Sequence, residues 1–294
     1  MRIVSLLPAA TEIAAALGAG PELVGISHEC DHPPQVASLP RVTRSAIDAS
    51  RSSAEIDRQV RERSGAGHAL FALDETRLAT LAPELVLTQA LCDVCAVAED
   101  DVRALAARLS PSPAVVTLGG TSLGGVFDDV RRVATALGRP EAGDRLVAAL
   151  EARVRAVHER LKAAGAPRPR VAVIEWTEPL FAAGHWTPEL VRRAGGEDVL
   201  ARAGTHSREV NADEVRLARP DVIVVAPCGF DLARAGTELD RLRGSPAWSW
   251  ARDLRWAALD GNALLSRPGP RLVDALEQLA GVLHPQLQGQ GTGE

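Results

Sequence analysis

Several features common in other classes of protein are missing or scarce in this sequence. It has no tyrosine and one methionine, and aromatic residues make up 3% of its 294 residues. Proteins that bind single-stranded nucleic acid combine basic grooves with exposed aromatic rings. Here the net charge is −5, and basic residues neither form a run nor alternate with aromatic ones. Nucleic acid is therefore not an expected partner.

Long apolar stretches are also missing. A membrane-spanning helix needs about 18 or more consecutive apolar residues, and the sequence contains no such run. The apolar run at residues 3–7 is too short for a secretion signal, and no cleavage-type sequence precedes the helix that opens at residues 8–12. The chain as written is expected in the cytoplasm, whereas an upstream start would make it periplasmic or membrane-tethered.

What is present is an alternation of strand and helix patterns, which is typical of an α/β fold with doubly wound parallel sheets. Short apolar runs predict strands at residues 2–7, 23–27, 39–43, 85–88, 114–118, 171–175, 221–226 and 256–259. Helical patterns lie between them, at residues 12–17, 53–63, 74–81, 100–109, 188–194, 212–218 and 271–283.

The strand pattern stops between residues 123 and 163. Apolar residues recur there at helical spacing, and after an interruption at residues 138–140 a long helix is predicted over residues 141–163. A helix of this length suits a rigid connector between two domains. The predicted domains are an N-terminal lobe at 1–122, a helical connector at 123–166, a C-terminal lobe at 167–285 and a disordered tail at 286–294.

Four cysteines are the main clue to function from the residues themselves. Cys92 and Cys95 form a CxxC pair directly after the strand at 85–88, and Cys30 and Cys228 also follow strand-like runs. Open α/β sheets place their ligand chemistry at strand ends, and four thiolates complete a ligand set for zinc or an iron–sulfur cluster. The alternatives are small buried cysteines with a chance CxxC pair, or a redox dithiol at Cys92 and Cys95.

Other candidate contacts lie in loops that follow strands. A neutral His185 could coordinate cobalt or iron, and Trp186 could stack on a flat macrocycle, although a packed loop at the start of a helix is an equal alternative. Glu175 and Trp176 end a strand and could face the ligand or the core. Arg267 could bind carboxamides, propionates or phosphate, or could belong to a structural turn.

A family resemblance runs through the chain in order. It is carried by Ile3-Val-Ser-Leu-Leu-Pro-Ala-Ala-Thr-Glu12, Asp31-His-Pro-Pro34, Leu180-Phe-Ala-Ala-Gly184, Gly195-Gly-Glu-Asp and Ser266-Arg-Pro-Gly-Pro-Arg271. These segments resemble the vitamin B12 (cobalamin) substrate-binding proteins of ABC importers. The resemblance implies two α/β lobes bridged by one long helix, with a ligand in the cleft between the lobes and an ABC permease as a possible partner. Members bind cobalamin, haem, siderophores or bare metal ions, so the fold does not select the ligand.

The chain departs from this family in two respects. Family members are exported, whereas no leader is predicted here. The cysteines, within Glu29-Cys30-Asp31, Cys92–Cys95 and Pro227-Cys228-Gly229, are not part of the general importer pattern. We recognise no G-x-S-x-G motif, no P-loop and no G-x-G-x-x-G after a strand, and we predict no catalytic residues.

The sequence therefore predicts a protein that binds cobalamin, another corrinoid or a related metal chelate without transforming it. The first alternative is a cytosolic metalloprotein with a four-cysteine iron–sulfur cluster or zinc, and the second is a thiol-dependent enzyme that modifies a corrinoid. The predicted ligand contacts are Pro8, Glu29, Asp31, Glu175, Trp176, His185, Trp186, Phe230 and Arg267. The predicted metal ligands are Cys30, Cys92, Cys95 and Cys228.

Overall fold

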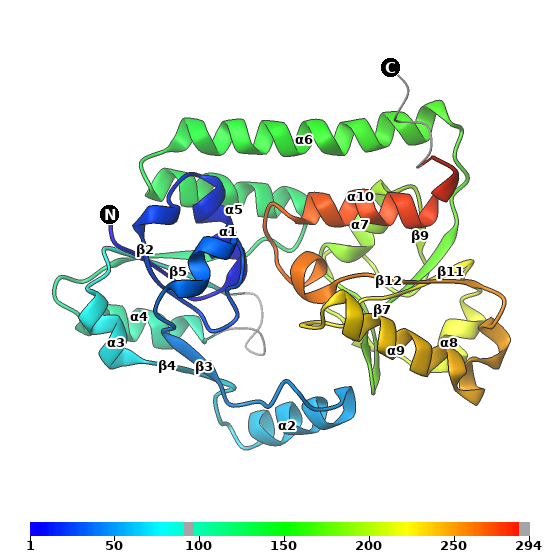
Figure 1. The fold of residues 1–294 in the computed structure, drawn as a ribbon, viewed down its shortest axis with the longest axis horizontal. Helices are drawn as coiled ribbons and strands as arrows, with labels where there is room; N and C mark the ends of the chain where they lie inside the picture. The colour runs from blue at the N-terminus through cyan, green and yellow to red at the C-terminus, as the bar shows by residue number, and fades with distance from the viewer. Residues whose placement is uncertain (91–96, 288–294) are drawn as a thin grey trace. The chain divides into compact units, whose positions relative to one another are not determined.

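The computed structural model describes residues 1–90 and 97–287, and Figure 1 shows its ribbon. The chain divides into two compact units. Unit 1 comprises residues 1–120 and 124–148, and unit 2 comprises residues 121–123 and the chain from residue 149 onward. Each unit contains its own sheet and helices, so the predicted α/β class with two lobes is confirmed. The exact domain limits and the ligand cleft expected from the resemblance stay predictions.

Unit 1 is built on a parallel sheet with the strand order β2-β1-β5-β6. Its strands are β1 (Ile3–Ser5), β2 (Leu23–Ile26), β5 (Leu85–Gln89) and β6 (Ala114–Leu118). All four correspond to predicted short apolar runs, which are typical of parallel strands that are covered on both faces. The helices of this unit include α1 (Pro8–Ala16), α2 (Ser53–Gly65), α3 (Glu75–Leu81) and α4 (Glu99–Arg108). Val4 and Val86 of the sheet pack with Leu78 of α3 and Val102 of α4 in one core cluster.

A small antiparallel sheet in unit 1 corrects one prediction. Residues 39–43 were expected to form a strand, but β3 occupies Thr43–Ser45 and pairs with β4 (Phe71–Leu73). Within the predicted stretch Arg41 forms an isolated bridge with Ile26, and a 3₁₀ helix at Pro34–Ser38 lies before it. Pro40 has no N–H group to donate to a sheet, which explains why the strand begins beyond it.

Unit 2 contains a sheet with the order β10-β8-β7-β11-β12, and β9 also pairs with β7. Its strands are β7 (Arg170–Thr177), β8 (Leu180–Ala182), β9 (Glu197–Asp198), β10 (Arg208–Glu209), β11 (Val222–Val225) and β12 (Arg255–Ala258). β7, β11 and β12 run parallel, whereas β8 and β10 form an antiparallel edge. Its helices include α7 (Thr187–Arg193), α8 (Ala212–Leu217), α9 (Leu232–Gly244) and α10 (Leu272–Leu283).

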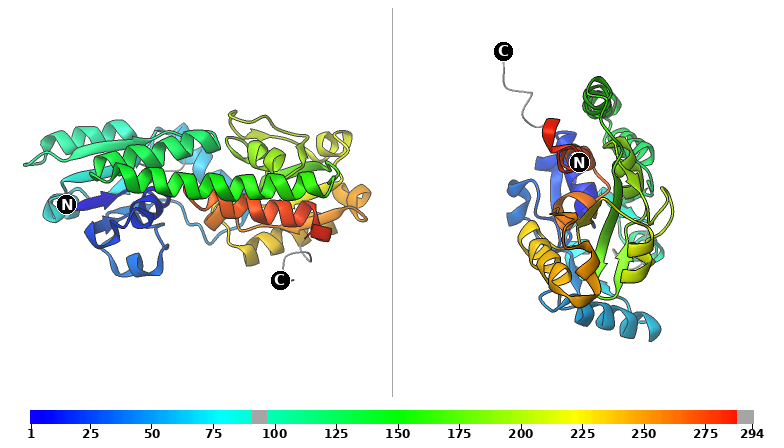
Figure 2. Two further views of the ribbon diagram at one scale, coloured as in Figure 1. Left: turned by 90° about the horizontal axis from the view of Figure 1, so that it is seen from above. Right: turned by 90° about the vertical axis from the view of Figure 1, so that its right-hand side faces the viewer.

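Two helices in the middle of the chain include residues from both units. α5 (Leu123–Ala136) begins in unit 2 and continues in unit 1, and α6 (Pro140–Ala163) begins in unit 1 and ends in unit 2. The 24 residues of α6 match the predicted connector helix. Within unit 2, Arg153 of α6 forms ion pairs with Asp274 (2.5 Å) and Glu277 (2.6 Å) of α10, and these helices lie side by side in Figures 1 and 2.

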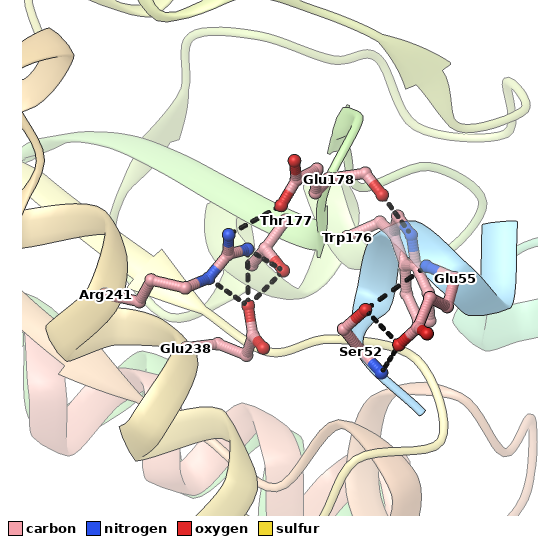
Figure 3. Close-up of polar contacts among 7 residues, drawn as sticks. All are labelled: Ser52, Glu55, Trp176, Thr177, Glu178, Glu238 and Arg241. Carbon is pink, nitrogen blue, oxygen red and sulfur yellow. Dashed lines mark hydrogen bonds and ion pairs between the residues drawn. The ribbon is translucent and has the colours of Figure 1, made fainter. Parts of the chain in front are cut away.

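Side-chain hydrogen bonds fix several helix ends, and Figure 3 shows two of the polar groups involved. In unit 1, α2 begins with a capping box, in which Ser52 Oγ accepts the Glu55 N–H (3.3 Å) and Glu55 Oε2 accepts the Ser52 N–H (3.1 Å). In unit 2, Arg241 of α9 donates to Glu238 Oε2 (2.8 Å) and to Glu178 Oε2 (2.6 Å). The hydrogen bond from Arg241 to Glu178 links α9 to the turn between β7 and β8.

Candidate functional site

Three neighbouring parallel strands of unit 2 end at the same edge of the sheet. The order β7-β11-β12 places their carboxyl ends side by side, and open α/β sheets bind ligands at such ends. After β11, the Cys228 N–H donates to the Glu175 carbonyl of β7 (2.9 Å), and after β12 the Asn262 N–H donates to the Phe230 carbonyl (2.9 Å). The structure thus brings together three of the predicted ligand contacts, Glu175, Trp176 and Phe230, with the predicted metal ligand Cys228.

The two aromatic residues at this edge differ in how much surface they offer. Their rings lie 5.2 Å apart between centroids and are tilted by 57°. Phe230 is 2% exposed, and the guanidinium of Arg234 lies 3.5 Å from its ring centroid. Trp176 is half-buried, and its indole N–H donates to the Glu178 carbonyl (3.1 Å). Trp176 therefore offers indole surface to a ligand, whereas Phe230 supports it from the core side.

Arg267 belongs to the same edge through Asn262. It is 3% exposed, and its Nη2 donates to Asn262 Oδ1 (3.0 Å). The turn that carries Asn262 lies so close to the β11 loop that a Cβ on Gly261 would stand 2.1 Å from the Pro227 carbonyl oxygen, so a glycine is required there. Sequence reasoning missed Asn262, because a single asparagine after a strand forms no recognisable motif.

The loop that follows β8 is tied to two other segments of unit 2. The Gly184 N–H points to Glu175 Oε2 at 3.4 Å. A Cβ on Gly184 would stand 2.4 Å from the backbone nitrogen of Ser207, so only glycine allows the two loops to approach this closely. The close packing fixes the position of His185, the next residue.

His185 and Trp186 were predicted together as ligand contacts, but they occupy different environments. Trp186 is 7% exposed, and its indole N–H donates to the Leu265 carbonyl (2.8 Å). This satisfied, buried side chain supports the packed alternative for Trp186. His185 is half-buried and stacks against Trp186 with 5.5 Å between centroids, while His206 meets it edge-on at 5.1 Å. Burial lowers the pKa of His185, and His206 lowers it further, which favours the neutral form of the ring.

A cavity of about 610 Å³ opens beside this loop, also within unit 2. It is lined by Asp198, Val199, Leu200, Ala201, Arg202, Thr205, His206 and Arg208. Asp198 Oδ1 accepts the N–H groups of Leu200 (2.9 Å) and Ala201 (3.0 Å). Its Oδ2 is buried and meets no hydrogen-bonding partner in the described part of the chain. Burial raises the pKa of Asp198 to about 6, against the two N–H groups that lower it. The sequence singled out neither Asp198 nor His206.

The remaining predicted ligand contacts lie at strand ends of unit 1. Pro8 is the first residue of α1, just after β1, and is half-buried. Glu29 and Asp31 lie in the loop after β2, and both are exposed. The loop itself is held in place, because Arg41 Nη1 donates to the carbonyls of Ser27 (2.9 Å) and Cys30. These three residues lie at the carboxyl edge of their own sheet, where α/β folds bind ligands. A contact role for them stays a prediction.

Cys30, unlike its acidic neighbours, is enclosed. It is 1% exposed, and its Sγ lies 3.0 Å from Thr11 Oγ1 and 3.4 Å from Ser27 Oγ. Thr11 Oγ1 also donates to Ser5 Oγ (2.8 Å), and all of these side chains are buried. A thiol inside a hydroxyl cluster supports the alternative of a small packed residue.

The predicted four-cysteine metal site cannot be assembled from the described residues. Cys92 and Cys95 fall within residues 91–96 and lie outside them, and Cys228 is exposed in unit 2. Over residues 1–90 and 97–287, no three His, Cys, Asp or Glu residues are grouped so that they could hold a metal ion. An iron–sulfur cluster or zinc on Cys30, Cys92, Cys95 and Cys228 therefore remains a sequence-based prediction without structural support.

The expectation that the chain has no G-x-S-x-G motif is wrong. Gly120-Thr121-Ser122-Leu123-Gly124 matches G-x-S-x-G and joins β6 to α5, which is the strand-to-helix context of a hydrolase nucleophile. In such enzymes the N–H of the residue after the serine binds the oxyanion. Here the Leu123 N–H donates to Glu189 Oε2 (3.0 Å). The N–H group that would bind the oxyanion is thus already hydrogen-bonded to a carboxylate. This arrangement does not support a hydrolase site.

No helix in the described ranges is both long and apolar enough to cross a membrane.

A family model described as periplasmic binding protein matches residues 3–251. The vitamin B12-binding protein of Vibrio cholerae serotype O1 is 25% identical over 282 residues, which cover 95% of this chain and 87% of the relative. The vitamin B12-binding protein of Pectobacterium atrosepticum is 24% identical over 288 residues, covering 96% and 88% of the two chains.

Solved structures match over nearly the whole chain as well. The periplasmic heme-binding protein RhuT from Roseiflexus sp. RS-1, in its apo form, is 25% identical with a TM-score of 0.68, covering 98% of this chain and 99% of the other. The periplasmic vitamin B12 binding protein BtuF of Vibrio cholerae shares the fold, with a TM-score of 0.67, 24% identity and 98% of each chain covered.

Proposed function

The chain belongs to the periplasmic binding protein family, and we propose that it binds a flat metal chelate, in the first place a corrinoid of the cobalamin type. The two curated relatives described above are named as vitamin B12-binding proteins, and their matches cover 95% and 96% of this chain. Their names confirm the prediction of a binding role rather than an enzymatic one. Haem is the second candidate ligand, because a solved relative of 25% identity is a heme-binding protein.

The proposed contact surface in unit 2 is the sheet edge formed by the ends of β7, β11 and β12. The observation that carries the proposal is the half-buried indole of Trp176, which is held against Phe230 at 5.2 Å and fixed through its N–H. A rigid aromatic ring of this kind can stack on a flat macrocycle at little conformational cost. Glu175 directly precedes Trp176 in β7, and Gly184, the residue before His185, points its N–H to Glu175 Oε2; Glu175 and His185 are the proposed polar contacts.

The contribution of unit 1 is proposed at the ends of β1 and β2. Pro8, Glu29 and Asp31 follow these strands, and the two carboxylates are exposed and attached to a loop that Arg41 anchors. Exposed carboxylates suit hydrogen-bond donors such as the amide groups at the rim of a corrinoid. They repel the propionates of haem, which makes the corrinoid the better match for this loop.

As part of an import system, the protein would deliver its ligand to an ABC permease outside the cytoplasm. Fractionation of the native cells, followed by immunodetection, tests this part of the proposal. Recovery with the periplasm or membrane is the expected result. Recovery with the cytoplasm alone would exclude import while leaving the binding function in place.

Titration of the purified protein with cyanocobalamin and, separately, with haem tests the binding function. We expect cyanocobalamin to bind with a dissociation constant of about 1 μM or lower, measured by calorimetry. Tighter binding of haem would replace the corrinoid by haem as the ligand. If neither chelate binds, the proposed function is wrong.

A further inference from the structure

The indole of Trp176 depends on the turn that follows its strand. Its N–H donates to the carbonyl of Glu178, two residues farther along the chain (3.1 Å). Residues 178–179 form the turn between β7 and β8, and the Glu178 side chain is 54% exposed. A hydrogen bond orients a ring only as firmly as its acceptor is held. The conformation of this turn therefore decides where the ring points.

Arg241 of α9 holds this turn at two successive residues. Its Nη1 donates to Glu178 Oε2 (2.6 Å), and its Nη2 donates to the Thr177 hydroxyl (3.3 Å). Thr177 is 4% exposed, and its own hydroxyl donates to Glu238 Oε2. Figure 3 shows Thr177, Glu178 and Glu238 gathered around the guanidinium, with the bond from Trp176 reaching Glu178. The acceptor of the indole N–H is thus tied to α9.

The guanidinium of Arg241 is itself fixed from within α9. Its Nε (3.2 Å) and Nη2 (2.8 Å) both donate to Glu238 Oε2, one turn earlier in the same helix. Glu238 is 9% exposed. An exposed ion pair such as that of Arg241 with Glu178 would contribute little by itself, but a polar network with buried members makes its surroundings rigid. The network therefore fixes the turn rather than merely touching it.

We infer that Arg241 is a positioning residue for ligand binding, because it fixes the turn after β7 and thereby holds the Trp176 ring ready for stacking. This inference rests on the proposed function and adds to it a residue that acts through Trp176. A ring that is ordered before the ligand arrives loses no conformational freedom on binding, whereas a ring released by the loss of Arg241 must be ordered by the ligand. Removing Arg241 therefore weakens binding although the stacking surface remains.

The hold on the ring can be measured without any ligand. Nitrogen-15 NMR resolves the indole N–H signals, and the signal that is missing from Trp176→Leu is that of Trp176. We expect this N–H to exchange with water about fivefold faster in Arg241→Ala and in Glu178→Ala. Glu178→Ala leaves the accepting carbonyl in place and removes only an exposed pair, so loss of stability does not explain its effect. Unchanged exchange in either folded variant would overturn the inference.

The affinity for cyanocobalamin or haem, whichever binds, measures the consequence for the ligand. We expect Arg241→Ala and Glu178→Ala each to lose about fivefold in calorimetry. Glu178→Gln keeps an oxygen that accepts from Arg241 and should stay within about twofold of the natural protein. Arg216→Ala, which removes the exposed pair with Asp213 on α8, is the matched control and should not change the affinity. Thermal melting checks the fold of each variant, and an equal loss in Arg216→Ala would contradict the inference.

A double substitution shows whether the effect passes through Trp176. In a Trp176→Leu background, Arg241→Ala should change the affinity by less than about twofold, because the ring that it positions is gone. A further loss of about fivefold there would mean that Arg241 acts on binding by another route, and the inference would be wrong. If the natural protein binds neither chelate, the proposed function is wrong, and the ligand-free exchange rates then decide by themselves whether Arg241 positions the ring.

Discussion

Asp198 is a carboxyl group whose ionisation opposes folding. Its pKa is raised from 3.8 to about 6 by burial, so the folded state holds a proton that the unfolded chain releases near pH 4. The folded state therefore binds more protons in this window, and the free energy of unfolding falls as the pH rises from about 4 to about 6. Above about pH 6 this decrease in the free energy of unfolding is complete and amounts to about 3 kcal/mol at most.

Asp198→Asn removes this pH dependence. The amide oxygen can still accept the Leu200 and Ala201 N–H groups, while the charge is gone. We expect the stability of the variant relative to the natural protein to rise by about 1–3 kcal/mol between pH 4 and pH 8, measured by urea unfolding at a series of pH values. Taking the difference cancels the titration of the buried histidines, which is common to both proteins. A difference that stays constant with pH would show that Asp198 is ionised normally.

For single residues, the sequence predicted where they lie in the fold better than what their side chains contact. It identified Glu175, Trp176, Cys228 and Phe230 at strand ends because apolar runs mark where the strands stop. It could not separate Trp176, which keeps exposed indole surface, from Trp186, whose N–H is satisfied by Leu265 inside the core. That difference depends on contacts with residues up to 79 positions away, and no local pattern encodes them.

At the scale of elements, a polar group holds α9 against the end of β7. Glu238 is 9% exposed and accepts from Arg241 (2.8 Å) and from the buried Thr177 hydroxyl, as Figure 3 shows. Arg241 also reaches Glu178 in the turn after β7 (2.6 Å). Without Arg241 the Glu238 carboxylate would be a largely buried group that has lost its cationic partner.

Arg241→Ala should therefore lower the free energy of unfolding by about 1–3 kcal/mol. Arg216→Ala on α8 is the control, because Arg216 pairs with Asp213 at 3.1 Å on a surface where both side chains are exposed. Such pairs are worth less than about 1 kcal/mol. Urea unfolding of both variants gives the comparison, and equal effects would mean that the Arg241 group adds no more than a surface pair.

Most helices and strands could be predicted from hydrophobic periodicity, and the exceptions have physical causes. α9 (Leu232–Gly244) was not predicted, because Gly236 lies within it and one of its four buried positions is the charged Glu238. β8 and β10 are 3 and 2 residues long and pair antiparallel at one edge, so they are too short for a periodic pattern to form. Short elements of this kind depend on the sheet that they join.

On the scale of the whole molecule, α6 connects the two compact units as one continuous helix. Ala148 is its last residue in unit 1 and Ala149 its first in unit 2, and both are exposed. A glycine at an exposed position inside a helix costs about 1 kcal/mol relative to alanine. This cost arises only if the helix persists there in solution.

Ala149→Gly therefore tests the continuity of α6. We expect it to cost as much as Ala156→Gly, a substitution at an exposed site farther along the same helix, with both measured by urea unfolding. A full cost at Ala156 with none at Ala149 would show that the helix is interrupted at the division between the units.

The whole-chain resemblance predicted more of the molecule than any local pattern did. It implied two α/β lobes with one long helix, and the family match over residues 3–251 confirms the family. It did not predict the ligand, because relatives with the same fold are named for vitamin B12 and for heme. The choice between them depends on side chains at the strand ends, where this chain has its own residues.

A flat chelate is proposed to stack on Trp176 at the carboxyl edge of the sheet in unit 2. The most direct test compares the affinity for cyanocobalamin, by calorimetry, of the natural protein, Trp176→Leu and Trp250→Leu. Trp250 is also partly buried, but it stacks on Trp248 at 5.8 Å in the segment that precedes β12, at the other end of that strand. We predict a loss of about tenfold or more for Trp176→Leu and none for Trp250→Leu. Unchanged affinity in Trp176→Leu, or equal losses in both variants, would contradict the claim.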